Sequence, residues 1–169
     1  AMQLLWINLV TDSLPAIALG VDPPDCDLLT KGKNTAHLFN ASMTASIIFE
    51  GLMVGALGLG AFCTGVFLYG STAAGRTMCF CVLSLCQLVH AFNMRSETES
   101  IFKVGIFKNK LLVLSFIIGC AMQVGVVCFL PELFGAASLG FSQWCIIAAL
   151  SAAPLVVVEL QKALNRLFY

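Results

Sequence analysis

The sequence predicts an all-α integral membrane chain with five transmembrane helices, on the basis of its composition, its length and its apolar stretches. Apolar residues make up 59% of the 169 residues and charged residues only 11%, against about 45–50% and about 25% in an average soluble domain. A spanning helix needs about 20 apolar residues, so a chain of this length has room for about five. Helices are expected because a backbone in lipid must satisfy its own hydrogen bonds.

The charge balance and the absence of familiar motifs exclude several classes of function. Nine basic and nine acidic residues give a net charge of zero, which excludes a basic nucleic-acid-binding protein and an acidic disordered chain. The sequence contains no P-loop, HExxH, nucleophile elbow or dinucleotide glycine motif. We therefore expect the lipid bilayer as a partner, no nucleic acid, and no enzymatic activity in this chain alone.

Five apolar stretches place the expected helices within one membrane domain that covers residues 1–169. Their approximate bounds are 2–21, 43–69, 77–94, 111–130 and 142–161. The first stretch is not a signal peptide, because it lacks a basic leader and contains polar residues. The second has glycines whose small-residue face favours close helix packing, against this chain or against a helix that the chain does not contain. These glycines are Gly51, Gly55, Gly58 and Gly60.

The basic residues predict how the helices are oriented. Eight of the nine basic residues fall in 22–42, in 95–110 or after the fifth stretch, and only Arg76 falls on the other side. The positive-inside rule then places 22–42, 95–110 and the C-terminus in the cytoplasm, with outward loops near 70–76 and 131–141. Charges alternate with apolar pairs in 95–110, which fits a short amphipathic piece at the membrane interface or a solvated connector equally well.

The strongest chemical signal lies in the first stretch, at Asn8, Thr11 and Asp12. The i, i+3, i+4 spacing places all three on one face of an α-helix. An amide carbonyl, a hydroxyl and a carboxylate are oxygen donors of the kind that Ca²⁺ prefers. A carboxylate at membrane depth is costly unless it is partnered, and Pro15 cannot donate a backbone hydrogen bond to the carbonyl of Thr11. The residues therefore predict a cation site, with hydrogen bonding to neighbouring helices as the alternative.

Other polar residues of the apolar stretches have less specific interpretations. Gln87 could supply a neutral oxygen to the same site or hold two helices together by a hydrogen bond. For His90 the interhelical role is favoured. Glu50 and Glu159 fall near the cytoplasmic helix ends, where snorkelling or pairing with basic residues is favoured over ion binding.

The eight cysteines predict neither a metal site nor a disulfide framework. There is no CxxC pair, and Cys79 and Cys81 would point about 200° apart on a helix, which is a poor chelate. Cysteine in these stretches behaves as a small apolar side chain.

Two motifs resemble a known family. Residues 3–16 read QLLWINLVTDSLPA and are followed by Ala18-Leu19-Gly20 and Pro23-Pro24-Asp25; this segment resembles the sixth transmembrane helix of P-type calcium-transporting ATPases. Residues 87–96, QLVHAFNMRS, resemble the end of the eighth helix. The resemblance implies that the five stretches are helices six to ten, a fragment of the ten-helix membrane domain, and the family's topology agrees with the orientation predicted from charge.

The resemblance also implies a function and a set of site residues. The parent would export Ca²⁺ from the cytosol, driven by ATP with Mg²⁺ through an aspartyl-phosphate intermediate. Asn8, Thr11 and Asp12 would ligate the ion. Gln87 stands where subfamilies with two calcium sites carry a glutamate, which is typical of the single-site type. Manganese is also compatible with these oxygen donors.

Several family elements are missing from the sequence. There is no DKTGT phosphorylation motif, and the resemblance assigns upstream helices and cytosolic domains of the parent as partners, so this chain would hold half of the ion site. Asp25 and Asp27 match the family's cytoplasmic coupling loop. The compact loops favour a bacterial plasma membrane. The alternatives are a small channel or secondary carrier with an Asp-bearing helix, and an assembly subunit with no ion site.

Overall fold

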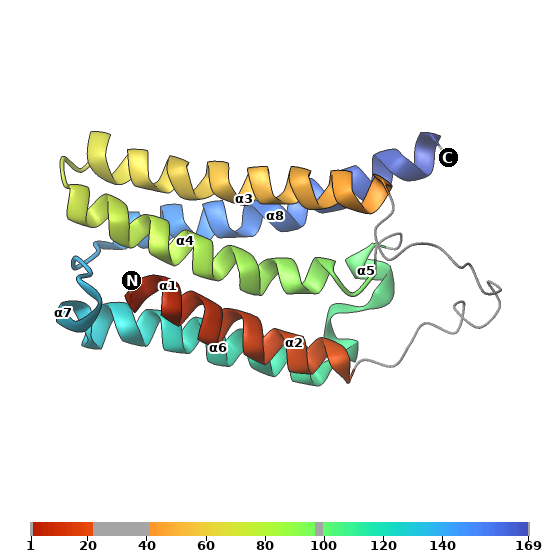
Figure 1. Ribbon diagram of the computed structural model, residues 1–169, viewed down its shortest axis with the longest axis horizontal. Coiled ribbons are helices and arrows are strands. Elements are labelled where there is room, and N and C mark those ends of the chain that lie inside the picture. The colour runs from red at the N-terminus through yellow and green to blue at the C-terminus, as the bar shows by residue number, and fades with distance from the viewer. Residues whose placement is uncertain (1, 22–40, 97–99, 169) are drawn as a thin grey trace.

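The computed structural model describes residues 2–21, 41–96 and 100–168, and its long helices run alternately up and down (Figure 1). The first membrane helix is formed by three successive pieces: α1 (Met2–Trp6), the π-helix η1 (Ile7–Asp12) and α2 (Ser13–Gly20). The other long helices are α3 (Ala41–Phe67), α4 (Thr72–Asn93), α6 (Lys110–Phe129) and α8 (Phe141–Phe168). Short helices in the connections are α5 (Ile101–Val104), η3 (Ile106–Lys108) and α7 (Pro131–Phe134). The described residues contain no β-strand.

Within the described residues, five helices are long and apolar enough to cross a membrane, which confirms the expected number. One predicted boundary is wrong: the third helix begins at Thr72 and not near residue 77. Ser71 starts it five residues early because its hydroxyl accepts a hydrogen bond from the backbone N–H of Ala74, 3.2 Å away. Arg76 therefore lies within α4 and not in the preceding loop.

The connections also differ from the prediction. The segment expected as the outward loop 131–141 contains the short helix α7, which ends at Gly135 in the left-handed conformation. The fifth long helix continues to Phe168, beyond the expected end near residue 161.

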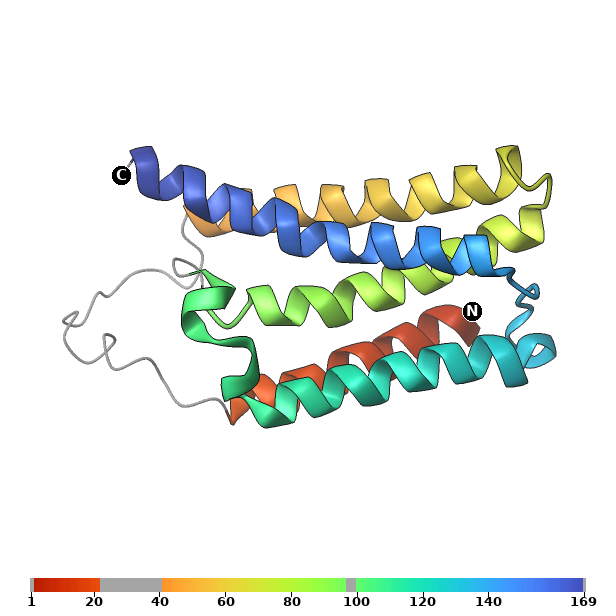
Figure 2. The same cartoon turned by 180° about the vertical axis from the view of Figure 1, so that it is seen from behind.

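Helices α3 and α4 form a tight hairpin beside α8, whereas the first membrane helix lies along α6 (Figures 1 and 2). A Cβ added to Gly65 would lie only 2.2 Å from the Cα of Gly75, so these two backbones approach as closely as glycine allows. Gly58 packs against the side chain of Leu83, whose Cδ2 would lie 2.8 Å from an added Cβ. The predicted close packing thus holds for Gly58, while Gly51, Gly55 and Gly60 have nothing within 4 Å of the added Cβ.

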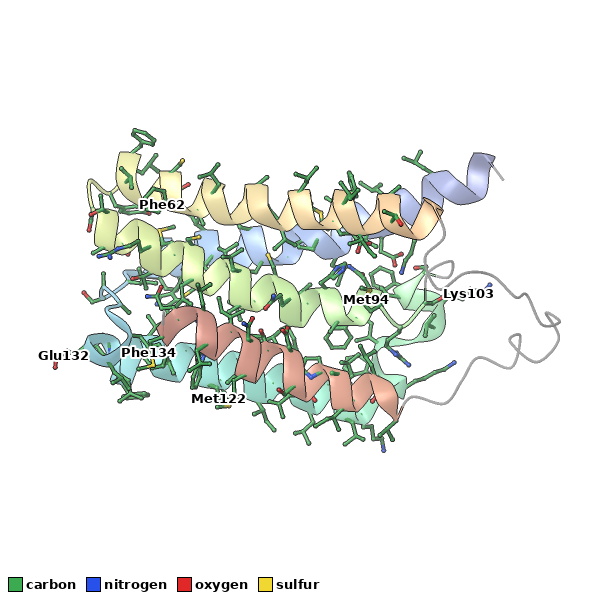
Figure 3. All side chains as sticks on the ribbon, in the orientation of Figure 1. Phe62, Met94, Lys103, Met122, Glu132 and Phe134 are labelled. Carbon is green, nitrogen blue, oxygen red and sulfur yellow. The ribbon has the colours of Figure 1, made fainter. Side chains whose placement is uncertain are left out.

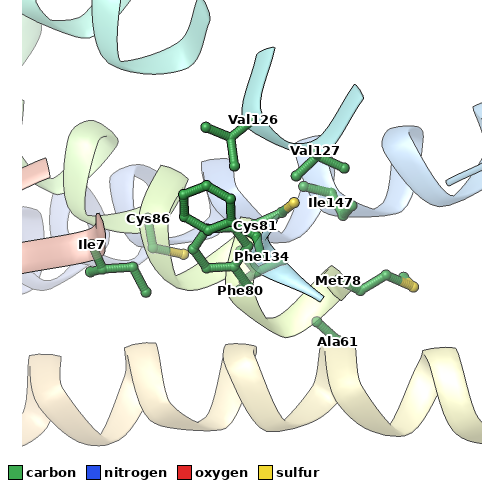
Figure 4. Close-up of a cluster of buried hydrophobic side chains, with 11 residues drawn as sticks. Ile7, Ala61, Met78, Phe80, Cys81, Cys86, Val126, Val127, Phe134 and Ile147 are labelled. Atoms are coloured by element: carbon green, nitrogen blue, oxygen red, sulfur yellow. The ribbon is translucent and has the colours of Figure 1, made fainter. Parts of the chain in front are cut away.

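Helix α4 is the centre of the bundle, because it contacts α3, α6, α8 and η1. Figure 4 shows the larger core cluster, in which Met78, Phe80 and Cys81 of α4 meet side chains from α6, α7 and α8. Phe134 of α7 stacks on Phe80 and meets the indole of Trp6 edge to face, with ring centroids 5.3 Å apart. This cluster joins the first membrane helix to the rest of the bundle.

Polar side chains link the helices where the surroundings are apolar. Gln123 of α6 is 1% exposed, and its carbonyl oxygen accepts from the indole N–H of Trp6 at 3.2 Å and from the hydroxyl of Ser84 at 2.9 Å. One amide therefore connects three helices. A side chain also compensates for Pro154 in α8. Proline has no N–H to donate to the carbonyl of Leu150, and the thiol of Cys86 in α4 lies 3.9 Å from that oxygen instead.

The Gln123→Leu substitution should destabilise the bundle. It keeps the approximate size of the side chain but leaves the half-buried donor of Trp6 and the buried donor of Ser84 without their acceptor, which should cost about 1 kcal/mol. Thermal unfolding in detergent would measure the loss. Met122→Leu, a neighbouring change on an exposed position of the same helix, is the control. Equal unfolding temperatures for the two variants would contradict a structural role for the amide.

Candidate cation site in the first membrane helix

The first membrane helix changes its geometry where the polar residues lie. Residues 7–12 form a π-helix between two α-helical pieces. Pro15, which is buried in α2, removes one backbone donor just after this segment. Such π segments occur at functional sites and re-aim the side chains that they carry.

The π-helix divides the three predicted ligands between two faces. Thr11 is 3% exposed, whereas Asn8 and Asp12 are both exposed. The prediction that all three share one face assumed α-helical rotation, but a π-helix rotates less per residue, so Thr11 turns inward while Asn8 and Asp12 stay aligned one turn apart. The structure thus groups Asn8 with Asp12 and places Thr11 on the adjoining, packed side.

Thr11 connects this helix to α4 through Gln87. Its hydroxyl lies 2.6 Å from the side-chain carbonyl oxygen of Gln87 and also contacts the backbone carbonyl of Ile7. The hydroxyl has one proton, so it donates to one of these oxygens at a time. Gln87 therefore has the interhelical role that was one of its two predicted interpretations, and it lies next to one of the three predicted ligands.

The packed side of the helix is held along its whole length by hydrogen bonds. The Gln3 amide donates to the carbonyl of Phe134 at 2.8 Å, and two carbonyls of α2 also accept bonds from the α6 region. The amide of Asn109 donates to the carbonyl of Ala18. The hydroxyl of Ser115 lies 3.2 Å from the carbonyl of Leu14 and 2.8 Å from that of Leu111 in its own helix, so its one proton serves one of these oxygens at a time. These contacts fix the rotation of the helix, and with it the direction in which Asp12 points.

The opposite side of the helix has no covering element among the described residues. Four apolar side chains there are each more than 60% exposed: Leu4, Leu5, Leu9 and Ile17. Asn8 and Asp12 are exposed as well. Apolar residues can face lipid, but a carboxylate facing lipid is costly. Chemically this face offers one negative charge and one amide, and the described residues contain no group of three or more His, Cys, Asp or Glu side chains that could hold a metal.

The remaining polar residues of the predicted spans bind other parts of the chain. Nε2 of His90 lies 3.1 Å from the carboxylate of Glu50, so α4 and α3 are paired as the interhelical interpretation predicts. The carboxylate of Glu159 accepts from the hydroxyl of Ser100 at 2.5 Å and from the backbone N–H of Ile101 at 2.8 Å. Neither acid lies on the Asp12 face.

Two predicted features are only partly covered by the structure. Asp25 and Asp27, expected in a coupling loop, lie outside the described residues. The seven described cysteines are all free thiols, and Cys81 and Cys86 are buried in the apolar interior.

Sequence reasoning missed several side chains that position the site. Gln123, Asn109 and Ser115 hold the first helix, yet none was singled out. A signal was present in Gln123, a single amide within a continuous apolar stretch. No comparable signal marks Asn109 and Ser115, because hydrogen bonds to backbone carbonyls leave no pattern in the sequence.

Comparison with known proteins agrees with this architecture. A family model described as "Cation transporting ATPase, C-terminus" matches residues 1–164. The chain is 42% identical over 181 residues to calcium-transporting ATPase 1 of Bacillus cereus, covering 95% of this chain and 20% of that protein. It is 31% identical over 175 residues to a calcium-transporting ATPase of Listeria monocytogenes, covering 100% of this chain and 19% of that protein.

The similarity extends to eukaryotic proteins: over 171 residues the chain is 29% identical to calcium-transporting ATPase 1 of Schizosaccharomyces pombe, covering 98% of this chain and 19% of that protein. The chain spans about a fifth of the length of the curated relatives that it matches. With five membrane helices and a family model that matches almost every residue, the chain belongs to the family of cation-transporting ATPase C-terminal regions.

Proposed function

We propose that this chain is the ion-handling part of an ATP-driven pump that exports Ca²⁺ from the cytosol, and that Asn8 and Asp12 contribute directly to the ion site. The observation that carries the proposal is the exposed pair on the uncovered face of the first membrane helix. A carboxylate at membrane depth requires a partner, and upstream helices of the parent would cover this face. The names of the relatives supply the ion, since those listed above are calcium-transporting ATPases.

Thr11 and Gln87 would have a second role at the same place. In the parent, the oxygen of the Thr11 hydroxyl would bind the ion through a lone pair while its proton stays on the bond to Gln87, which keeps the helix aligned with α4. A neutral amide at position 87 supports the single-calcium-site type, because it adds an oxygen without a second charge. Mn²⁺ would suit the same donors.

The rest of the proposal follows the family topology. The five long helices would be helices six to ten of the parent, with 22–42, 95–110 and the C-terminus in the cytoplasm of a bacterium. Phosphorylation, ATP and Mg²⁺ would belong to upstream domains, whose movement would reach the site through the loop that contains Asp25 and Asp27. The mechanism would be alternating access, with ATP-driven movements opening the site to each side in turn. A small channel or secondary carrier is not favoured, because the named relatives are ATPases.

Asp12→Asn in the intact pump should abolish Ca²⁺-dependent phosphorylation by ATP. The change keeps the shape of the side chain and removes the only charge that this helix offers to the ion. Phosphoenzyme formation against Ca²⁺ concentration would measure the effect. Glu132→Gln, which neutralises a carboxylate in α7 outside the long helices, should leave the curve unchanged. A normal Ca²⁺-activated phosphoenzyme in Asp12→Asn would refute the assignment.

Asn8→Ala should weaken Ca²⁺ binding by about tenfold or more, because a neutral ligand is lost from a site of few donors. Leu9→Ala is a matched control, since Leu9 is an exposed neighbour whose side chain has no oxygen to offer an ion. Direct ⁴⁵Ca²⁺ binding to the purified pump would separate the two variants. Equal affinities would favour an assembly role for the polar face.

Thr11→Val and Gln87→Leu test whether the hydrogen bond between these two residues stabilises the helix bundle. Each variant removes one side of the 2.6 Å contact, and their effects on thermal stability should be coupled by about 1 kcal/mol. Differential scanning measurements on the two single variants and the double variant would give the coupling energy. Simple additivity would show that the contact contributes nothing to the bundle.

A further inference from the structure

The connection between α4 and α6 is a compact element at the end of the bundle where α2 and α4 end and α6 begins (Figure 3). We call residues 100–110 the bracket; it contains α5, η3 and the first residue of α6. Its composition is SIFKVGIFKNK, with three lysines and no acidic residue. Glu97 and Glu99 precede it and lie outside the described residues.

The bracket is fixed to the bundle at three points. Glu159 of α8 accepts two hydrogen bonds at its start, and Ile101 beside them is 2% exposed. In the middle, the Arg95 guanidinium donates to the carbonyl of Gly105 at 2.7 Å. At its end, Asn109 caps α6 by accepting from the N–H of Leu112 and donates to the carbonyl of Ala18. Its backbone is therefore fixed before any partner arrives.

The outer side of the bracket combines large apolar groups with positive charges. Phe102 is 69% exposed and Phe107 is 78% exposed. Lys103, Lys108 and Lys110 are exposed as well. Gly105, with a φ of +88°, forms the turn between α5 and η3, where a Cβ would lie only 3.2 Å from Cγ of Lys108. Phe102, Phe107, Lys108 and Lys110 thus form the exposed surface of an element that is rigid at its base.

We propose that the bracket binds anionic lipid headgroups of the cytoplasmic leaflet, with Phe102 and Phe107 inserted at the boundary between headgroups and acyl chains. Its position supports this occupant, because the candidate spans end at Gly20 and Asn93 and begin again at Lys110, which places the bracket at membrane-surface depth. The lysines complement the negative charge of the cytoplasmic leaflet, and exposed aromatic side chains are favoured at this interface. The leaflet follows from the orientation proposed above.

Lipid binding here would act on the ion-site helix. Asn109 holds the carbonyl of Ala18 in α2, two turns beyond Asp12 along the same helix. A lipid that restrains Lys108 and Lys110 therefore restrains the cytoplasmic end of the helix that carries the polar pair. Of the two interpretations that the sequence leaves open for 95–110, the proposal corresponds to the amphipathic piece at the membrane interface.

Photocrosslinking identifies what touches the bracket. A benzoylphenylalanine at position 107 of the full-length pump, in nanodiscs of phosphatidylcholine and phosphatidylglycerol, should give mainly lipid adducts. The same probe at position 101, which is buried a few residues away, should crosslink only within the protein. Adducts from position 107 to upstream domains of the pump would identify a protein partner and overturn the proposal.

Charge substitution tests the headgroup preference. In Lys108→Gln/Lys110→Gln, the ratio of phosphatidylglycerol to phosphatidylcholine retained by the pump in mass spectrometry should fall by about thirtyfold, the size expected when two lysines, each contributing about 1 kcal/mol, leave an anionic surface. Lys108→Arg/Lys110→Arg keeps both charges and should retain the original ratio. An unchanged ratio in the glutamine variant overturns the proposal. Because lipid retention needs no ion transport, the result is independent of the assignment of Asn8 and Asp12.

Discussion

The structure depends on hydrogen bonds that hold the first membrane helix by one side. Gln3, Trp6 and Thr11 donate from this helix, and its later carbonyls accept from Ser115 and Asn109. In lipid there is little hydrophobic force between apolar helices, so polar contacts and close packing determine how they associate. These bonds fix the rotation of the helix, and every other property of the site follows from that rotation.

The first consequence is an asymmetric helix. Its packed side carries Thr11, while its uncovered side carries Asn8 and Asp12 among exposed leucines. The π-helix contributes to this separation, since α-helical rotation would place Thr11 closer to the direction of Asn8. Asp12 has the one carboxylate of this helix, and it lies on a face that no other described residue covers. A carboxylate at membrane depth is costly without a partner.

The sequence was sufficient to predict the fold class and the number of spans, because apolar length and charge placement are constraints imposed by the bilayer itself. It assigned Arg76 to the loop before the third span, whereas Arg76 lies within α4, because the cap formed by Ser71 starts this helix before the charged residue. It identified the residue types of the candidate site but not their division between two faces, because the π-helix depends on tertiary contacts. Asn109 and Ser115 could not be found at all, since their partners are backbone carbonyls of a distant helix.

Charge balance gives a further constraint on the proposed ion site. Asp12 offers one negative charge to a divalent cation. Gln87 of α4, which contacts Thr11, adds no charge. Glu50 and Glu159 are committed to His90 and to the start of the bracket, so neither can make up the difference without breaking an interaction that holds two elements together. A divalent ion held only by this face would keep a net positive charge in a medium of low dielectric, which is strongly unfavourable. The proposed site therefore requires at least one more carboxylate, and the upstream helices proposed to cover this face are where we expect it.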